Sequence, residues 1–188
     1  MKYVGLSISA LLAACTTQAL EGGDKPPAVS EVQSKTADIS HDNGGHAHKV
    51  HDEPRPYDAT ADAELDVNHT LVSAKENGKL GLLVFGANWC HDSRALAAHF
   101  ERPRFQTLLK KHFEMTYVDV GQKNRNIELA QSFGVKDIVG TPTVFVTNSD
   151  GMVLNLDTAP TWRNAASRAE GDVFDYFEDF TADFKGPE

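Results

Sequence analysis

Cys90 and its neighbours are the residues of this sequence best suited to chemistry. Cys90 lies within residues 87–93, Ala-Asn-Trp-Cys-His-Asp-Ser, directly after the apolar run 80–86. That run predicts a buried strand, and a helix should follow Cys90. At a helix start, unpaired N–H groups and the positive end of the helix dipole stabilise a thiolate, the reactive form of cysteine. We interpret Cys90 as a nucleophile; the alternative is a buried, inert thiol.

Three neighbours of Cys90 are further candidates for the site. His91 could add positive charge beside the sulfur when protonated, although it could also merely occupy a variable position. Trp89 would shield one side of the sulfur. The Ser93 hydroxyl could donate a hydrogen bond to the Cys90 thiolate. Asp92 is interpreted as an exposed residue that favours the helix dipole.

Hydrophobic periodicity predicts the elements that must position Cys90. In chain order we expect a helix over 59–76, a strand over 80–86, a helix from Cys90 to about Phe100, a second helix over about 104–112 that Pro103 starts, a strand over 113–120, a short helix over 126–133, a strand over 141–148, a turn at 149–151, a strand over 152–156 and a last helix from about 165 to 184. Mixed helices and strands in this order predict an α/β, three-layer fold with a central mixed β-sheet flanked by helices.

Apolar side chains recur along the first and last of these helices. They are Leu65, Leu71 and Val72 in the first, and Val173, Phe177, Phe180 and Phe184 in the last. The second set has helical spacing and should pack on the sheet. The opposite face of the last helix is acidic and should be solvated.

Two segments resemble the thioredoxin superfamily. Residues 84–90, Val-Phe-Gly-Ala-Asn-Trp-Cys, precede a helix, and residues 140–145, Gly-Thr-Pro-Thr-Val-Phe, open a later strand. The resemblance extends over about residues 59–184. The helix split at Pro103 is similar to the thioredoxin-like domains of periplasmic thiol reductases. The resemblance implies a thioredoxin-like fold with thiol–disulfide exchange at Cys90.

The same resemblance implies a substrate site at Thr141 and Pro142. It implies a cis peptide bond between these residues and a loop that lies beside the cysteine. Backbone groups of Thr141 would then bind an extended substrate strand, with Trp89 nearby. The alternative is a proline that merely starts a strand.

Two residues depart from the pattern of redox-active thioredoxins. Ser93 replaces the second cysteine of Cys-x-x-Cys, so the chain cannot resolve a mixed disulfide with a second thiol of its own. Val84 replaces the buried aspartate that classical thioredoxins carry six residues before the first cysteine. Three modes remain open: a monothiol cycle that an external thiol completes, isomerisation of substrate disulfides, and binding of client thiols without turnover.

The N-terminus resembles a bacterial lipoprotein signal. Lys2 precedes the apolar or small residues 4–14, and Leu-Ala-Ala-Cys at 12–15 resembles a lipobox. We expect residues 1–14 to be removed and Cys15 to be lipidated, with Thr16 favouring the outer membrane by resemblance to enterobacterial sorting. The alternatives are an ordinary leader or a chance apolar run at a cytoplasmic start.

Residues 15–56 are predicted to be a lipidated, disordered tether, followed by a thioredoxin-like domain over 57–188. Four histidines of the tether, His41, His46, His48 and His51, could bind a metal. No pair of them is predicted on a helix or in a closed loop, so we expect a solvated linker and no metal or cofactor.

The composition narrows the function further. The 188 residues carry a net charge of −9, which argues against a nucleic-acid partner. With Cys15 lipidated, Cys90 would be the one free thiol. The sequence therefore predicts an envelope lipoprotein that faces the periplasm and contacts the membrane only through its lipid. We expect it to act on protein thiols or disulfides, with a small external thiol as a candidate co-reactant. The alternative is a non-enzymatic binding module for an envelope protein or a metal.

Overall fold

A three-stranded mixed sheet forms the centre of the domain. The computed structural model describes residues 53–182 and 184, which fall within the unit formed by residues 47–188. The predicted signal peptide, Cys15 and the tether histidines lie outside the described residues. The strands are β1 (Leu80–Gly86), β2 (Phe113–Asp119) and β3 (Thr143–Thr147). Their order is β2-β1-β3, with β1 parallel to β2 and antiparallel to β3.

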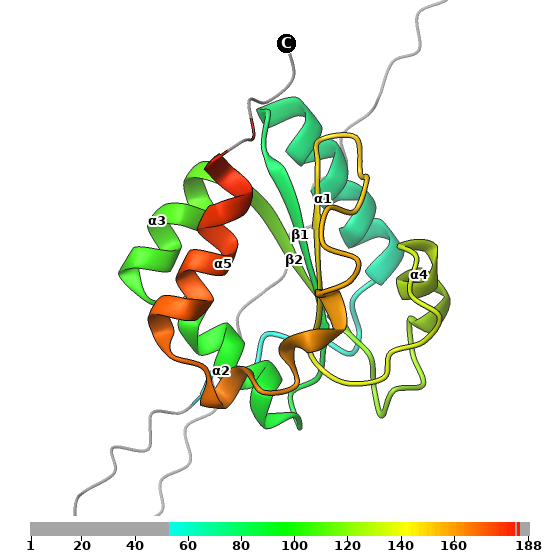
Figure 1. The fold of residues 1–188 in the computed structure, drawn as a ribbon. Coiled ribbons are helices and arrows are strands. Elements are labelled where there is room, and N and C mark those ends of the chain that lie inside the picture. Colours follow the sequence, from blue (N-terminus) through cyan, green and yellow to red (C-terminus); the bar gives the residue numbers. More distant parts are fainter. Residues whose placement is uncertain (1–52, 183, 185–188) are drawn as a thin grey trace, which may run out of the picture. The chain divides into compact units, whose positions relative to one another are not determined.

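Helices cover both faces of this sheet (Figure 1). Helices α1 (Ala63–Asn77) and α4 (Ile127–Ser132) pack on one face. Helices α2 (His91–Phe100), α3 (Pro103–His112) and α5 (Glu170–Ala182) pack on the other. Every residue of β1 is buried, because side chains alternate between two covered faces. The predicted three-layer α/β fold is confirmed.

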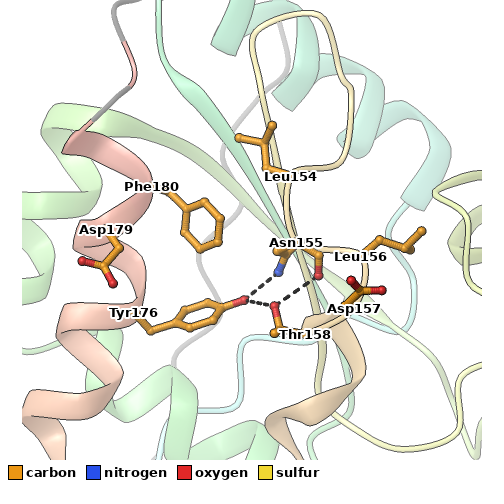
Figure 2. Close-up of a pocket in the computed structure, with 8 residues that line it drawn as sticks. All are labelled: Leu154, Asn155, Leu156, Asp157, Thr158, Tyr176, Asp179 and Phe180. Carbon is orange, nitrogen blue, oxygen red and sulfur yellow. Dashed lines mark hydrogen bonds between the residues drawn. The ribbon is translucent and has the colours of Figure 1, made fainter.

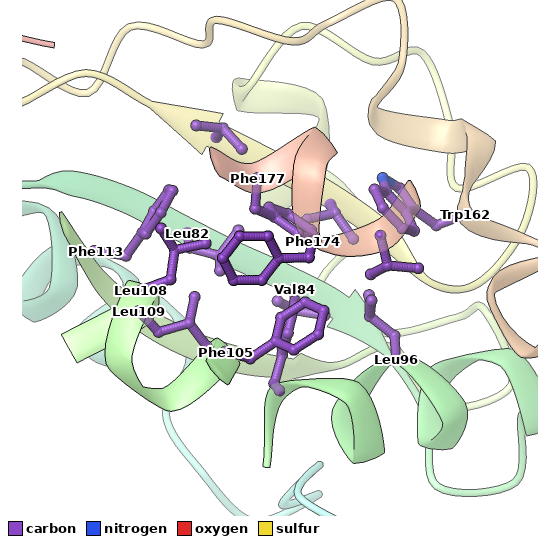
Figure 3. Close-up of a cluster of buried hydrophobic side chains, with 14 of the residues drawn as sticks. Leu82, Val84, Leu96, Phe105, Leu108, Leu109, Phe113, Trp162, Phe174 and Phe177 are labelled. Carbon is purple, nitrogen blue, oxygen red and sulfur yellow. The ribbon is translucent and has the colours of Figure 1, made fainter. Parts of the chain in front are cut away.

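The core on the α2, α3 and α5 side is rich in aromatic rings (Figure 3). Phe100 meets Phe177 edge-on at 5.2 Å between ring centroids, and Phe105 meets Phe174 at 5.3 Å. Such rings bury large apolar areas and add about 0.5–1.5 kcal/mol per pair through their geometry. This packing holds α2, and with it the residue that precedes α2, against the end of β1.

The first helix begins later than expected, at Ala63, because the Asp62 side chain accepts a hydrogen bond from the Leu65 N–H at 3.1 Å and caps it. It ends as predicted, with Gly78 in the left-handed region at φ 62°. Leu65 and Val72 are 64% and 54% exposed. The helix instead turns Val67 and Ala74 to the core, which lie seven residues apart on one helical stripe.

The predicted fourth strand over 152–156 is wrong. In this segment Val153 forms an isolated bridge with Thr147, and the pairing ends there. The Asn155 side chain takes the place of a strand, accepting from the Val146 N–H at 2.8 Å and donating to the Val144 carbonyl at 2.8 Å. A side-chain amide offers the same donor and acceptor as a peptide group, so the edge of β3 is satisfied without a further strand.

The chain from β3 to α5 differs from the expected single helix. Two short 3₁₀ helices, Ala159–Trp162 and Ala165–Ser167, precede α5, which begins at Glu170. Val173 and Phe177 are buried as predicted, and Phe180 and Phe184 pack partly against the core. Among the described residues, no helix is both long and apolar enough to cross a membrane.

Candidate functional site

Cys90 stands between the buried strand β1 and helix α2, as predicted. It is the N-cap residue of α2, and its own N–H donates to the Ala87 carbonyl at 3.0 Å. The carbonyl of Cys90 accepts the first helical bond, from the Arg94 N–H at 3.1 Å. The residue is partly buried and lies at the positive end of α2, where the helix dipole favours negative charge on its sulfur.

The Thr141–Pro142 loop lies against the Cys90 sulfur. The peptide bond between the two residues is cis, which confirms the expectation from the resemblance. The Cys90 Sγ–H donates to the Thr141 carbonyl oxygen at 3.3 Å. Thr143 closes the loop by donating from Oγ1 to the Gly140 carbonyl at 2.9 Å. Strand β3 thus brings a residue 51 positions away into contact with the thiol.

Ser93 is fully buried on the inner side of α2. Its Oγ accepts a hydrogen bond from the Ala87 N–H at 3.4 Å, which ties α2 to the loop that leaves β1. In this thiol form the sulfur bonds to Thr141, so the expected bond from Ser93 to a thiolate stays a prediction.

His91 and Trp89 lie on the exposed side of the site. His91 Nδ1 is 3.6 Å from Glu53 Oε2, and its side chain is largely exposed. Trp89 is 48% exposed, and its indole N–H donates to the Gly121 carbonyl at 2.7 Å. That bond anchors the ring to the loop after β2. Their proposed roles in catalysis and substrate binding remain predictions.

The segment that leads into the domain forms part of the site, which the sequence analysis missed. The Asn88 side chain accepts from the Tyr57 N–H at 3.2 Å and donates to the Tyr57 carbonyl at 2.7 Å. Glu53, assigned above to the tether, pairs with Arg94 Nε at 2.9 Å. Arg94 also donates to the Asn88 carbonyl at 2.9 Å. The partners are separated by 31 or more residues, except within residues 88–94, so no local pattern could indicate them.

Asp92 has a structural partner. Its Oδ1 accepts from the Ala166 N–H at 2.9 Å, which fastens the second 3₁₀ helix to α2. Asp92 lies in the first turn of α2, as expected for a residue that favours the helix dipole. No cluster of metal ligands exists among residues 53–182 and 184.

A buried tyrosine, Tyr57, lies near Cys90 and packs against the partly buried Tyr117. Tyr57 and Tyr117 meet edge-on, with 5.2 Å between ring centroids. Burial raises the pKa of Tyr57, and the nearby Tyr117 raises this pKa further. The Ser93 hydroxyl acts in the opposite direction as a neighbouring hydrogen-bonding group, although the two hydroxyls do not form a hydrogen bond of normal geometry in this structure. Burial also raises the pKa of Tyr117, with Glu101 contributing. Both phenols therefore stay protonated wherever a thiol titrates.

A separate pocket of about 310 Å³ lies at the edge of β3 (Figure 2). It is lined by residues 154–158 and by Tyr176, Asp179 and Phe180, none of which belongs to the Cys90 site. Inside it, the Tyr176 hydroxyl accepts from Asn155 Nδ2 at 2.9 Å and lies 2.7 Å from Thr158 Oγ1. Because these polar atoms bond to one another, we interpret this pocket as a structural hydrogen-bond network.

Comparisons with known proteins found a family and solved structures that this chain is similar to. The family described as thioredoxin-like matches residues 61–149. The crystal structure of a disulphide isomerase from Xylella fastidiosa Temecula1 is 40% identical, with a TM-score of 0.64 over 68% of this chain and 98% of that chain. A thioredoxin-fold protein from Helicobacter pylori is 20% identical, with a TM-score of 0.35 over 64% of this chain and 92% of that chain. No curated protein sequence matches significantly.

The matches and the site rest on the same residues. The matched family segment contains Cys90, Ser93 and the cis bond before Pro142. The domain has the mixed sheet with helices on both faces that the sequence predicted. The chain belongs to the thioredoxin-like family.

Proposed function

We propose that this protein is an envelope-anchored thiol–disulfide oxidoreductase or isomerase of the monothiol type, with Cys90 as its nucleophile. One observation carries the proposal. Cys90 Sγ lies at the start of α2 and 3.3 Å from the Thr141 carbonyl, at the loop that holds the cis bond to Pro142. The likeness to a protein called a disulphide isomerase supports the same chemistry.

The first chemical step is attack on a substrate disulfide. The Cys90 thiolate bonds to one substrate sulfur, the substrate S–S bond breaks, and the other substrate sulfur leaves as a thiolate. Helix α2 stabilises the negative charge of the attacking thiolate through its dipole. Backbone groups of Thr141 hold the extended substrate segment, and the exposed Trp89 provides an apolar contact beside the sulfur. His91, when protonated, adds positive charge near the thiolate.

The second step must use a thiol from outside the chain's own motif, because Ser93 occupies the resolving position. In isomerisation, a thiolate of the substrate attacks the substrate sulfur of the mixed disulfide. A new substrate disulfide forms and the Cys90 thiolate leaves, with no net oxidation or reduction. In reduction, a small external thiol attacks the Cys90 sulfur of the mixed disulfide, and the substrate leaves with both of its sulfurs as thiols. A second external thiol then attacks the sulfur bound to Cys90, so that the two external thiols form a disulfide and the Cys90 thiolate is released. Isomerisation needs no further reagent.

The location of this chemistry follows from the N-terminal sequence. We propose that residues 1–14 are removed, that Cys15 carries the lipid, and that the domain faces the periplasm from the outer membrane. Residues 15–52 would let the domain reach protein disulfides away from the lipid surface. Replacing Cys15 with alanine should abolish palmitate labelling and release the protein from the membrane fraction. Retained labelling would contradict the anchor.

The decisive test traps the mixed disulfide. Full-length tagged protein is acid-quenched in cells and separated without reducing agent, beside Cys90→Ala and Ser93→Ala variants. We expect adducts with the parent and with Ser93→Ala, and none with Cys90→Ala. The purified lipoprotein should also recover activity of a scrambled-disulfide ribonuclease, in a Cys90-dependent manner.

The test also addresses the alternative of a binding module. If Cys90→Ala keeps the same protein partners and no adduct forms with the parent, the domain binds without thiol chemistry. Ser93→Cys sharpens the result. Gain of insulin reduction by this variant would show that the missing second thiol is what limits the parent to monothiol chemistry.

A further inference from the structure

Two hydroxyl groups lie buried behind Cys90, next to the same point of strand β1. Gly86 leaves this point free of a side chain: a Cβ built there would lie 2.5 Å from the Tyr57 hydroxyl oxygen and 2.7 Å from Ser93 Oγ. Tyr57 is only 3% exposed, and its hydroxyl has no hydrogen-bond partner among the described residues. A buried hydroxyl without a partner costs free energy, so its presence calls for an explanation such as use in another state of the site.

The hydrogen bonds of Ser93 decide what its proton is free to do. A serine oxygen accepts two hydrogen bonds and donates one. One acceptor position is taken by the Ala87 N–H at 3.4 Å. If the Tyr57 hydroxyl donates into the second position, the single Ser93 proton must point elsewhere. Cys90 lies on the preceding turn of the chain, as the N-cap of the helix in which Ser93 is the third residue.

The protonation of Tyr57 suits it to donate. Burial raises the pKa of Tyr57, so the phenol keeps its proton. A negative charge at Cys90 raises this pKa further, so Tyr57 is close enough to sense the thiolate. Two hydrogen bonds between Asn88 and the backbone of residue 57 hold the ring in place.

We propose that Tyr57 is a positioning residue for the Cys90 thiolate: its buried hydroxyl donates to Ser93 Oγ and turns the Ser93 proton towards the sulfur. In the thiol form, the Cys90 S–H bonds to Thr141 and the relay is idle. When the thiolate forms, the sulfur becomes an acceptor and the relay from Tyr57 through Ser93 stabilises it. The inference rests on the proposed role of Cys90 as a nucleophile. It assigns a task to Ser93, which occupies the position of the second cysteine in Cys-x-x-Cys.

Charged side chains on the elements around Cys90 must be held constant in this experiment. They are His91, Asp92 and Arg94 on α2, Glu53 and Arg55 on the segment before the domain, Asp119 at the end of β2 and Arg125 in the loop that follows β2. Residues 140–143, Gly-Thr-Pro-Thr, bring no titratable side chain. Substitutions of Tyr57 and Ser93 leave all these groups in place.

The experiment measures the pKa of the Cys90 thiol directly. Full-length protein is alkylated with iodoacetamide across a pH series, and the rate is read by mass spectrometry of the Cys90 peptide, so Cys15 does not interfere. We expect Ser93→Ala to slow alkylation near neutral pH about tenfold by raising the thiol pKa, since hydrogen bonds to charged groups are strong. Tyr57→Phe should slow it about threefold, as an indirect effect of one neutral hydrogen bond.

A double variant and a control separate the relay from a general disturbance. In the Ser93→Ala background, Tyr57→Phe should cause no further change. Tyr117→Phe removes the hydroxyl of the ring packed edge-on against Tyr57 and should leave the pH profile as in the parent. The proposal is overturned if Tyr57→Phe keeps the parental profile, or if its effect persists without the Ser93 hydroxyl.

The outcome is distinguishable from failure of the proposed function. Iodoacetamide reports on the thiolate without any protein substrate. If the pKa of the Cys90 thiol depends on Tyr57 but no mixed disulfides form in cells, the relay is supported and the proposed exchange activity is contradicted. If mixed disulfides form but the pKa of the Cys90 thiol does not depend on Tyr57, the exchange activity is supported and the relay is contradicted.

Discussion

Two tyrosines in this domain, the partly buried Tyr176 and the buried Tyr57, have opposite hydrogen-bond environments. The Tyr176 hydroxyl, at the edge of β3, lies within bonding distance of Asn155 and Thr158 (Figure 2). The Tyr57 hydroxyl, behind Cys90, has no partner among the residues that the structure describes. The first closes a network that replaces a missing strand. The second leaves a donor free beside Ser93 and the reactive sulfur.

The difference separates a hydroxyl that contributes to the stability of the fold from one that does not. Satisfied polar groups fix one arrangement, whereas an unsatisfied donor can serve a state that forms only during reaction. Lack of a partner is not sufficient evidence of function. His99 Nδ1, Thr147 Oγ1 and Trp162 Nε1 are also buried and unpartnered in the described part of the chain. Tyr57 differs from them because it lies next to the Cys-x-x-Ser motif.

The largest effect is expected at the satisfied site. Asn155→Ala removes the partners of the Val146 N–H and the Val144 carbonyl and leaves both buried. We expect a loss of about 3 kcal/mol in the free energy of unfolding, measured by urea denaturation. Alkylation of Cys90 should be unchanged. The exposed neighbour variant Leu154→Ala is the control; equal losses in both would contradict the role of the Asn155 amide.

Gly86→Ala should have the next largest effect. Its Cβ would meet the Tyr57 hydroxyl oxygen at 2.5 Å and Cζ at 2.6 Å, in a strand with no room to shift. We expect about 2 kcal/mol of destabilisation from overpacking. Gly171→Ala, where nothing lies within 4 Å, should not destabilise. A thermal melt checks both variants, and a fully stable Gly86→Ala protein would show that the space behind Cys90 is not tight.

The two tyrosines themselves give a smaller but sharper contrast. In the Cys90→Ala background, where no thiolate forms, Tyr176→Phe should cost about 1 kcal/mol because it breaks an existing network. Tyr57→Phe should change stability by less than about 0.5 kcal/mol, because the hydroxyl it removes has no partner. Chemical denaturation of both variants measures the difference. Equal costs would mean that Tyr57 is bonded as firmly as Tyr176.

The smallest effect is expected at His99, whose buried Nδ1 has no hydrogen-bond partner among the described residues and which has no proposed role at Cys90. Burial, with Arg102 contributing, lowers the pKa of His99, so the unfolded chain binds this proton more readily than the folded protein. The contribution of neutral His99 to the free energy of unfolding is therefore complete above the unfolded pKa of about 6.5. This contribution is lost as the pH falls below that value. His99→Leu should flatten this loss in unfolding experiments at acidic pH, whereas the exposed His69→Gln should not.

The same variant tests the comparison. If His99→Leu alters the rate of Cys90 alkylation, then unpartnered buried atoms in general affect the thiol, and the special place of Tyr57 disappears. An unchanged rate would support the assignment of chemistry to the Tyr57 and Ser93 hydroxyls alone.

Much of this molecule follows from its sequence. The buried strand β1 and the position of Cys90 at a helix start were predicted, because local patterning carries them. The cis bond before Pro142 was expected from the resemblance to the thioredoxin superfamily. The fourth strand failed for a local reason as well. Residues 152–156 are mostly apolar and follow a turn, as in a hairpin strand, but the Asn155 side chain takes the backbone's place at the edge of β3. Patterning cannot distinguish a backbone amide from a side-chain amide.

Only the tertiary structure decided which side chains surround the Cys90 sulfur. The sequence determined which residue is the thiol, which residue replaces its resolving partner and which loop should lie beside it. Only the folded chain brought Tyr57 behind Ser93, Glu53 to Arg94, and Asn88 to the backbone of residue 57. These contacts join segments far apart along the chain, and their register depends on how two helix layers pack on one sheet. No local periodicity encodes that packing.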